Sequence, residues 1–350
     1  MKKETLKVFQ IAVVFIGTFV GAGLASGKEI TEFFTSFGYK SFIGIIFCGI
    51  FYVIMGSILS KISITNNLNS YSEAMKLISP NILGKLTGII TTLYLISSAS
   101  IILAGSGALL NQFFHIPKIL GSLIMLCCAI IFLFRGTNGL IEVNSFIVPC
   151  LVVIMSTIFI LYFFLCKDML SLETIIHFPP KKSGVLISTI LYAGYNTLCS
   201  SGVLVPLSTE MKNSKTMIKG ISLGTLGLTL LCLIINLLLT INQPYIYEYE
   251  IPLLLVAERF GSLIQGFLLV IIWLEMFSTE VSDVYSISKT LEQSFNIKFK
   301  KGIFIVLFFA LLISQIGFTN LISTLYPAFG VLSLIFISQC FIFYFKHRKM

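Results

Sequence analysis

The first apolar segment of the chain contains Gly17-Thr18-Phe19-Val20-Gly21-Ala22-Gly23-Leu24-Ala25-Ser26-Gly27-Lys28-Glu29. Residues 17–27 include four glycines, two alanines and a serine, and each glycine costs a helix about 1 kcal/mol relative to alanine. Inside a bilayer, backbone without helical hydrogen bonds is tolerated only where protein or a water-filled cavity covers it. We therefore predict that the first helix unwinds near the middle of the membrane, where its free backbone groups bind a ligand.

A second half-helix is predicted to start directly after this break. Ser26 stands three residues before Glu29, which is the spacing of a capping box. The N–H groups of the half-helix suit an anion such as a carboxylate, and the carbonyls that end the first half-helix suit a cation. Such discontinuous helices form the substrate and ion sites of many secondary transporters. The predicted substrate-binding residues in the break are Gly21, Ala22, Gly23, Ser26 and Gly27.

Two simpler interpretations of this stretch stay open. Small residues in membrane helices often serve close helix packing. The stretch also resembles a secretory signal peptide, because Lys2, Lys3 and Lys7 precede an apolar run that ends in small residues near Ala25. Cleavage there would leave an odd set of spans with the wrong charge bias, which argues against a signal peptide.

The composition is that of a polytopic membrane protein. Of the 350 residues, 56% are hydrophobic and 11% are charged, and the mean hydropathy is +0.97. The net charge of +9 does not indicate nucleic-acid binding, because the basic residues lie in short loops between apolar runs. The cysteines lack metal-ligand spacing with histidine, so we expect buried thiols and no cofactor other than a coupling ion.

Ten segments are predicted to span the bilayer, which takes about 20 apolar residues. They are Leu6–Phe37, Phe42–Ser60, Leu86–Phe113, Ile119–Phe134, Leu140–Leu165, Val185–Leu207, Ile218–Ile241, Leu263–Ile287, Ile303–Ile316 and Leu321–Phe345. The first is long because it contains the break, and the ninth is short. The predicted fold class is an all-α integral membrane protein, with one transport domain over residues 1–350.

The distribution of basic residues predicts the orientation. An even number of spans places both termini on one side of the membrane. With that side in the cytoplasm, seventeen of the 24 Lys and Arg residues face inward and seven face outward, as the positive-inside rule favours. The pair Lys181-Lys182 is the local exception. We predict a multi-pass protein of the plasma membrane with both termini in the cytoplasm.

Two long segments lie outside the spans. The cytoplasmic segment Lys61–Lys85 is predicted to hold a short helix from Tyr71 to Ile78. The external segment Asn242–Arg259 turns apolar over Ile251–Ala257. It is interpreted either as a lid that dips back over the membrane or as a plain amphipathic connector.

A second break is predicted in the sixth span, which contains Tyr192-Ala193-Gly194-Tyr195-Asn196-Thr197-Leu198-Cys199-Ser200-Ser201-Gly202. Gly21 and Gly194 are 173 residues apart, about half of the chain. Spans one and six then become equivalent members of two inverted five-helix repeats, over residues 6–166 and 183–345. Paired interruptions at matching positions are the best sequence indication of a transporter site. The predicted substrate-binding residues in this break are Tyr195, Asn196 and Thr197.

The eighth span carries three acidic residues, and acids inside a span are costly and usually functional. Glu275 is the preferred proton carrier, and Glu280 shares a helix face with Asp283. The hydroxyls of Ser278 and Thr279 suit Na⁺, which is a hard cation. The alternative interpretation places Asp283 and Glu280 near the cytoplasmic surface.

Two charged residues of the first span also have simpler interpretations. Glu29 is explained structurally by the capping box. Lys28 and Glu32 are four residues apart and are expected to pair with each other.

The run Gly21-Ala22-Gly23-Leu24-Ala25-Ser26-Gly27-Lys28-Glu29-Ile30, followed by Phe33-Phe34, resembles the first-helix signature of the YkvI-type bacterial membrane proteins. These proteins resemble the wider amino acid–polyamine–organocation group, which has the LeuT-type fold. The resemblance extends over nearly the whole chain in span count and break positions. It implies a ten-helix core with substrate between helices one, three, six and eight, which adds Tyr94 and Ser98 to the predicted substrate site.

The same resemblance implies an ion site. In sodium-coupled members, an ion lies between first-helix carbonyls and a hydroxyl pair on helix eight. The matching positions are the carbonyls of Val20 and Gly23 and the hydroxyls of Ser278 and Thr279. Glu275 stands where these transporters usually have a small residue, so both Na⁺ and H⁺ are kept as coupling ions.

These observations predict a secondary active transporter of a small amino-acid-like solute, coupled to Na⁺ or H⁺, that works by alternating access. An enzyme is not expected, because the spans contain no Ser/His, His/Glu or paired-aspartate constellation. The alternative is a nutrient sensor, a receptor subunit of the spore-germination type with little net transport. The expected partners are a small-molecule substrate and the lipid bilayer, with no nucleic acid and an undefined oligomeric state.

Overall fold

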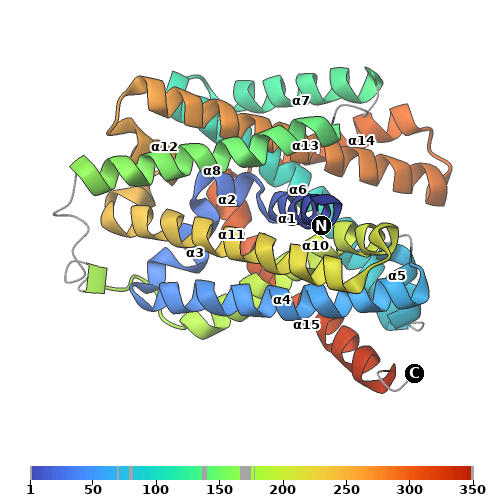
Figure 1. Cartoon of the computed structure of the whole chain (residues 1–350). Helices are drawn as coiled ribbons and strands as arrows, with labels where there is room; N and C mark the ends of the chain where they lie inside the picture. The colour runs from blue at the N-terminus through green and yellow to red at the C-terminus, as the bar shows by residue number, and fades with distance from the viewer. Residues whose placement is uncertain are drawn as a thin grey trace.

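The computed structural model describes residues 2–68, 71–78, 82–135, 140–165, 175–176 and 178–347, and all secondary structure in these residues is helical (Figure 1). Its helices are α1 (Lys2–Phe19), α2 (Ala22–Ser26), α3 (Lys28–Phe33), η1 (Thr35–Phe37), α4 (Lys40–Asn66), α5 (Tyr71–Ile78), α6 (Ile82–Phe114), α7 (Lys118–Arg135), α8 (Leu140–Leu165), α10 (Val185–Met211), α11 (Ser214–Ile241), η3 (Tyr245–Glu248), α12 (Pro252–Glu258), α13 (Ser262–Phe295), α14 (Phe299–Ser314) and α15 (Phe318–His347).

Each of the ten predicted spans corresponds to a helix, or to the set α1–α3 for the first span. Six helices in the described part of the chain are long and apolar enough to cross a membrane, namely α4, α6, α10, α11, α13 and α15. The predicted all-α, multi-pass membrane fold is thus confirmed. The short cytoplasmic helix is also confirmed, because α5 has the predicted bounds Tyr71–Ile78.

The first helix is broken where the glycines predicted it. After Phe19 the backbone is extended at Gly21, with φ −131° and ψ −172°, and α2 begins at Ala22. A second change of direction follows at Gly27, whose φ of +79° is a left-handed conformation that favours glycine. The first span therefore consists of α1, the five-residue turn of helix α2, and α3.

The predicted second break is wrong, because α10 runs without interruption from Val185 to Met211. Its polar side chains bond within the helix: Asn196 Nδ2 donates to the Tyr192 carbonyl at 3.1 Å, and Thr197 Oγ1 donates to the Ala193 carbonyl at 2.7 Å. Gly194 serves packing, since a Cβ there would lie 2.5 Å from Ser333 Oγ of α15. The polar residues and glycines that suggested a break are thus accommodated by a continuous helix.

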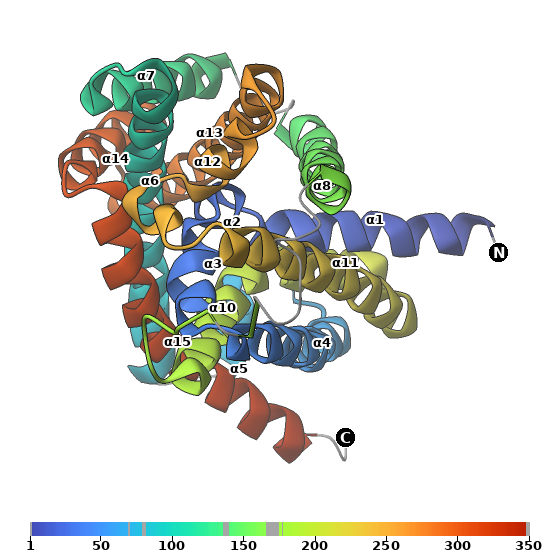
Figure 2. The same ribbon diagram turned by 90° about the vertical axis from the view of Figure 1, so that its left-hand side faces the viewer.

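The direction of α1 differs from that of its neighbours. In Figure 1, α4, α8, α11 and α13 run across the view while α1 is seen almost end-on, and in Figure 2 α1 extends outward from the bundle to the N-terminus. It crosses α11 at two glycines. A Cβ at Gly220 would lie 2.5 Å from Ile11 Cβ, and a Cβ at Gly224 would lie 2.8 Å from the Ala12 carbonyl oxygen.

Several contacts between two helices are matched by a contact between the equivalent helices of the other half of the chain, and we call two such contacts a couple. Helix α1 packs on α11 as α10 packs on α4, and α6 packs on α7 as α13 packs on α14. Two inverted five-helix repeats would produce these couples. One couple is unequal, because α10 packs far more extensively on α15 than α1 does on α8. The outward course of α1 explains this difference.

Candidate functional site

Glu29 does not cap a helix, and the predicted capping box is wrong. The N-cap of α3 is Gly27, not Ser26. The Ser26 hydroxyl donates to the Gly23 carbonyl at 3.0 Å and accepts from the Lys28 N–H at 3.2 Å. Because the left-handed Gly27 turns the chain between α2 and α3, the Ser26 and Glu29 positions no longer belong to one helix start.

The Glu29 carboxylate lies inside the bundle, where the side chain is only 2% exposed. It lies beside Gly23, since a Cβ at that position would be 2.5 Å from Glu29 Oε2. The polar groups of Tyr192, Tyr195 and Asn196 are within its reach. Glu29 Oε1 has no hydrogen-bond partner. A buried carboxylate oxygen without a partner is costly, so this position calls for a ligand or a proton.

Four tyrosines from three helices pack together next to Glu29, and we call them the tyrosine cluster: Tyr94 of α6, Tyr192 and Tyr195 of α10, and Tyr326 of α15. Tyr195 stacks on Tyr326 with ring centroids 4.5 Å apart. Tyr94 and Tyr192 lie 6.1 and 6.2 Å from Tyr195. The ring of Tyr326 also lies next to Gly23, 3.2 Å from the position of a Cβ there.

The three acidic residues of α13 that lie in the predicted eighth span are buried inside the protein. Glu275, Glu280 and Asp283 are 3%, 0% and 8% exposed. Each has at least one carboxylate oxygen without a hydrogen-bond partner. Asp283 lies within reach of Ser98 and near Tyr94 and Tyr326. The predicted residues Tyr94, Ser98, Tyr195 and Asn196 therefore gather with Glu29, Gly23 and Asp283.

The hydroxyls of the predicted ion site lie on the helix that packs against α2. Ser278 is 1% exposed, and Thr279 Oγ1 donates to the Glu275 carbonyl at 3.0 Å. On the other side, Val20 is the last residue whose N–H bonds into α1, at 3.0 Å from the Ile16 carbonyl. In the described part of the chain, no group of three or more His, Cys, Asp or Glu side chains has the arrangement of a metal site. Coordination of Na⁺ by these groups stays a prediction.

The remaining predicted substrate residues lie at several separate places in the structure. Gly21 faces open space, because a Cβ there would have no atom within 4 Å. Gly27 instead lies against the segment Asn242–Arg259 after α11, which we call the connector. Leu253 Cγ of this segment is 2.7 Å from a Cβ position at Gly27. Thr197 lines a narrow gap with Phe15, Phe19 and Tyr52, between α1, α4 and α10. Ala22 is buried in the first turn of α2.

The predicted pairing of Lys28 with Glu32 is wrong. Lys28 Nζ donates to the Tyr249 carbonyl at 3.2 Å, and Glu32 instead forms an ion pair with Lys182 at 2.5 Å. The turn at Gly27 and the packing of the connector decide these partners. Among the side chains that the structure describes, Lys28 is the one buried cation.

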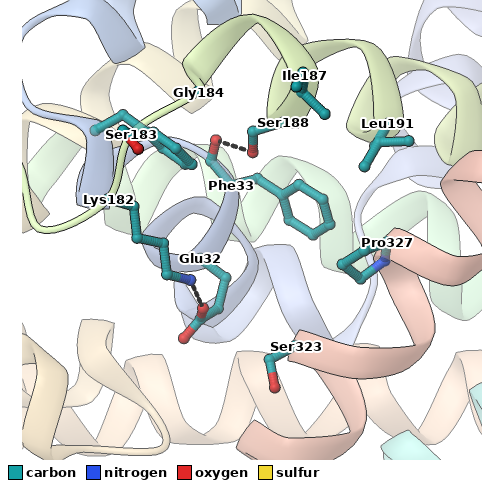
Figure 3. A pocket seen from close by; sticks show the side chains of 11 residues that line it. Glu32, Phe33, Lys182, Ser183, Gly184, Ile187, Ser188, Leu191, Ser323 and Pro327 are labelled. Atoms are coloured by element: carbon teal, nitrogen blue, oxygen red, sulfur yellow. Dashed lines mark hydrogen bonds and ion pairs between the residues drawn. The ribbon is translucent and has the colours of Figure 1, made fainter.

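A cavity of about 260 Å³ lies on the Lys182 side of the bundle (Figure 3). It is lined by residues of α3, of the start of α10 and of α15, including Glu32, Phe33, Lys182, Leu191 and Pro327. The Ser188 hydroxyl donates to the Phe33 carbonyl at 2.8 Å. Because the Phe33 ring also contacts Tyr192, at 5.2 Å between centroids, this side chain separates the cavity from the tyrosine cluster.

The connector after α11 folds back over the bundle. Helix α12 packs against α2, α11 and α13. Its apolar residues are buried except for the partly buried Leu255, and Gln112 bonds both the N–H and the carbonyl of Ile251 at 3.1 Å. This position fits a lid over the broken helix, rather than an amphipathic connector at the surface.

The broken first helix, the continuous helices around it and the buried acids define an integral membrane protein with the LeuT-type fold. Three solved structures share the fold. They are a Na⁺-coupled sialic acid symporter (15% identity, TM-score 0.70, covering 96% of this chain and 79% of that chain), MhsT in complex with L-phenylalanine (14%, 0.66, 97% and 91%), and Mhp1, a nucleobase-cation-symport-1 family transporter (14%, 0.66, 91% and 74%).

Sequence comparison places the chain more narrowly. It is 33% identical over 337 residues to the uncharacterized membrane protein YkvI of Bacillus subtilis (strain 168), covering 96% of both proteins. It is 24% identical over 338 residues to the uncharacterized protein YyaD of the same organism, covering 95% of both. No protein-family model matches the chain. The chain belongs to the YkvI family of membrane proteins.

Proposed function

We propose that this protein is a secondary active transporter of a small amino-acid-like solute, coupled to Na⁺ or H⁺, and a member of the amino acid–polyamine–organocation group. One observation carries the proposal: the interrupted first helix lies among buried acids and tyrosines from α6, α10, α13 and α15. Polar groups of this kind inside a bilayer are costly unless they bind or move something. The same arrangement gives no support to an enzyme.

One of the known structures supports an amino-acid-like solute. MhsT holds L-phenylalanine, and the other two neighbours hold a sialic acid substrate and bromovinylhydantoin. In this chain, no atom lies within 4 Å of a Cβ position at Gly21, so side chains do not fill the space beside the extended backbone there.

The coupling ion is assigned to the contact between α2 and α13. If Na⁺ is used, the carbonyls of Val20 and Gly23 and the hydroxyls of Ser278 and Thr279 are the proposed ligands. If H⁺ is used, Glu275 is the proposed carrier, because its buried carboxylate has an oxygen without a partner.

Alternating access is proposed to work between the halves 6–166 and 183–345, with both termini in the cytoplasm. The couples of helix contacts support two related halves, and the outward α1 supports a conformation opened at one end. Phe33 and the connector are proposed to close the Lys182 side in one conformation, and movement of α1 is proposed to open the opposite side.

Uptake into proteoliposomes tests the function. The purified protein would be reconstituted and exposed to each radiolabelled amino acid, with an imposed Na⁺ gradient, a pH gradient or neither. We expect accumulation of at least one amino acid that depends on one of the gradients. Binding without any uptake would contradict a transporter and would favour the nutrient sensor of the spore-germination type.

A further inference from the structure

Resting on the proposed function, we propose that Glu29 binds the positively charged amino group of the solute, so that an ammonium group is the feature that the site requires. The local sequence pattern indicates only a capping role for Glu29. The structure instead places its carboxylate at the junction of the broken helix and the tyrosine cluster.

The Glu29 carboxylate lacks a cation of its own. It is 98% buried, and its Oε1 atom has no hydrogen-bond partner. Lys28, the one buried cation among the described side chains, is bonded to the Tyr249 carbonyl of the connector. Hydrogen bonds between a carboxylate and an ammonium group are roughly twice as strong as neutral ones. A protonated amine would therefore supply the partner that the protein does not.

The surroundings hold the carboxylate in place while leaving one oxygen available. Tyr192, Tyr195 and Asn196 of α10 are within reach of Glu29. Glycine at position 23 lets the carboxylate lie against the backbone of α2, where a Cβ would be 2.5 Å from Oε2. Side chains fixed by such neighbours form a preorganised contact for a ligand.

A second unpartnered acid extends the same site. Asp283 Oδ2 has no hydrogen-bond partner, the residue is 8% exposed, and Tyr326 lies near both Asp283 and Glu29. Two acids and no described cation in one cluster favour a positively charged group over a neutral one. The solute carboxylate, where present, adds a separate contact, so an amine without a carboxylate is also expected to bind.

The test uses the full-length protein in detergent and three matched sets of compounds. The sets are L-phenylalanine, L-leucine and L-serine, each with its N-acetyl derivative and its decarboxylated amine (phenethylamine, isoamylamine and ethanolamine). Binding is measured from the rise in Tm with concentration. We expect at least one amino acid and its amine to raise Tm, while the N-acetyl derivative of the same compound has no effect.

Three variants assign the effect to Glu29. Glu29→Gln keeps the shape but removes the charge, and should weaken binding of both the amino acid and the amine by about tenfold to a hundredfold. Glu29→Asp keeps the charge and should retain selectivity for the amine over the N-acetyl compound. Glu258→Gln removes an exposed acid of the connector and should bind as the wild type does.

The proposal is overturned if the N-acetyl compounds bind as well as the parent amino acids, if Glu29→Gln binds normally, or if none of the amines binds to the wild type. Its failure differs from failure of the transport function. Gradient-driven uptake of an anionic or uncharged solute would overturn the ammonium site alone. Amine binding that depends on Glu29, without uptake under any gradient, would overturn the transport function alone.

Discussion

Glu29 lies against the backbone of Gly23, so closely that a single Cβ at Gly23 would be 2.5 Å from Glu29 Oε2. The contact joins α3 to α2 across the left-handed residue Gly27. Because Gly23 has no side chain, the Glu29 carboxylate can lie against its backbone. The requirement for glycine at position 23 therefore comes from the placement of Glu29 as well as from the break itself.

The first prediction follows from this contact. Gly23→Ala should displace the Glu29 carboxylate and weaken binding of L-phenylalanine or another bound amino acid by about tenfold or more, because overpacking a dense site costs about 1–3 kcal/mol. Gly202→Ala is the matched control. A Cβ at this exposed position of α10 would have no atom within 4 Å, and the residue lies outside the proposed site, so binding should change little. Equal losses in the two variants would contradict the role given to the Gly23 contact.

The second prediction concerns the ion. Replacing both Ser278 and Thr279 by alanine removes two oxygen ligands, so the rise in Tm caused by Na⁺ should disappear while the protein stays folded. The control is Ser286→Ala, which removes an exposed hydroxyl nearer the C-terminal end of α13. The Tm of this variant should respond to Na⁺ as that of the wild type does.

A different outcome would indicate that H⁺, not Na⁺, is the coupling ion. If the wild type shows no response to Na⁺ but binds its solute more tightly as the pH falls, the sodium assignment is wrong. Glu275→Gln should then remove the pH dependence, because the variant cannot gain or lose the proton.

The third prediction concerns topology. In a cysteine-free background, single cysteines at Lys61 and Lys215 should resist an impermeant thiol reagent in intact cells, because the positive-inside rule places both in the cytoplasm. A cysteine at Lys181 should react. All three residues are exposed, so access by the reagent reports the side of the membrane. The reverse labelling pattern would refute the orientation.

The fourth prediction concerns the cavity on the Lys182 side. The ion pair between Glu32 and Lys182 joins α3 to the segment before α10, and breaking it should favour opening on that side. Lys182→Gln should increase the labelling rate of a cysteine at Leu191, which lines the cavity. The effect should be severalfold at most, since a partly exposed pair contributes about 0.2–1 kcal/mol.

A charge reversal provides the control for the ion pair. The double variant Glu32→Lys with Lys182→Glu should restore the slow labelling of Leu191→Cys, because it recreates the attraction with exchanged signs. Faster labelling in the double variant than in Lys182→Gln would show that the pair does not hold this side closed.

The sequence predicted the first break well and the second one wrongly, for one physical reason. Between Gly17 and Gly27 the glycines are so dense that a continuous helix is disfavoured. In α10 the polar residues bond to their own helix, and Gly194 lets α15 approach. A single sequence does not distinguish polar residues that need an unwound backbone from polar residues that are satisfied within a helix.

The site was predicted in part. The structure brings Tyr94, Ser98, Tyr195 and Asn196 together, and their role in binding stays a prediction. Tyr192 and Tyr326 lie beside them but were not predicted, because aromatic residues in apolar spans normally belong to the core. Glu29 was misassigned because the local pattern with Ser26 matches a helix start. Only the left-handed turn at Gly27, a tertiary feature, sends its carboxylate into the bundle.

The outward course of α1 leaves apolar side chains of this helix exposed to the membrane. Leu6, Phe9 and Val14 of this helix are 58%, 60% and 37% exposed, and in a bilayer these surfaces face acyl chains. A cycle that brings α1 back toward α8 must expel those chains and admit them again when the helix leaves. In the proposed transport cycle, part of the work of each turnover would therefore be done on lipid, so the rate of solute movement should depend on the thickness and fluidity of the surrounding bilayer.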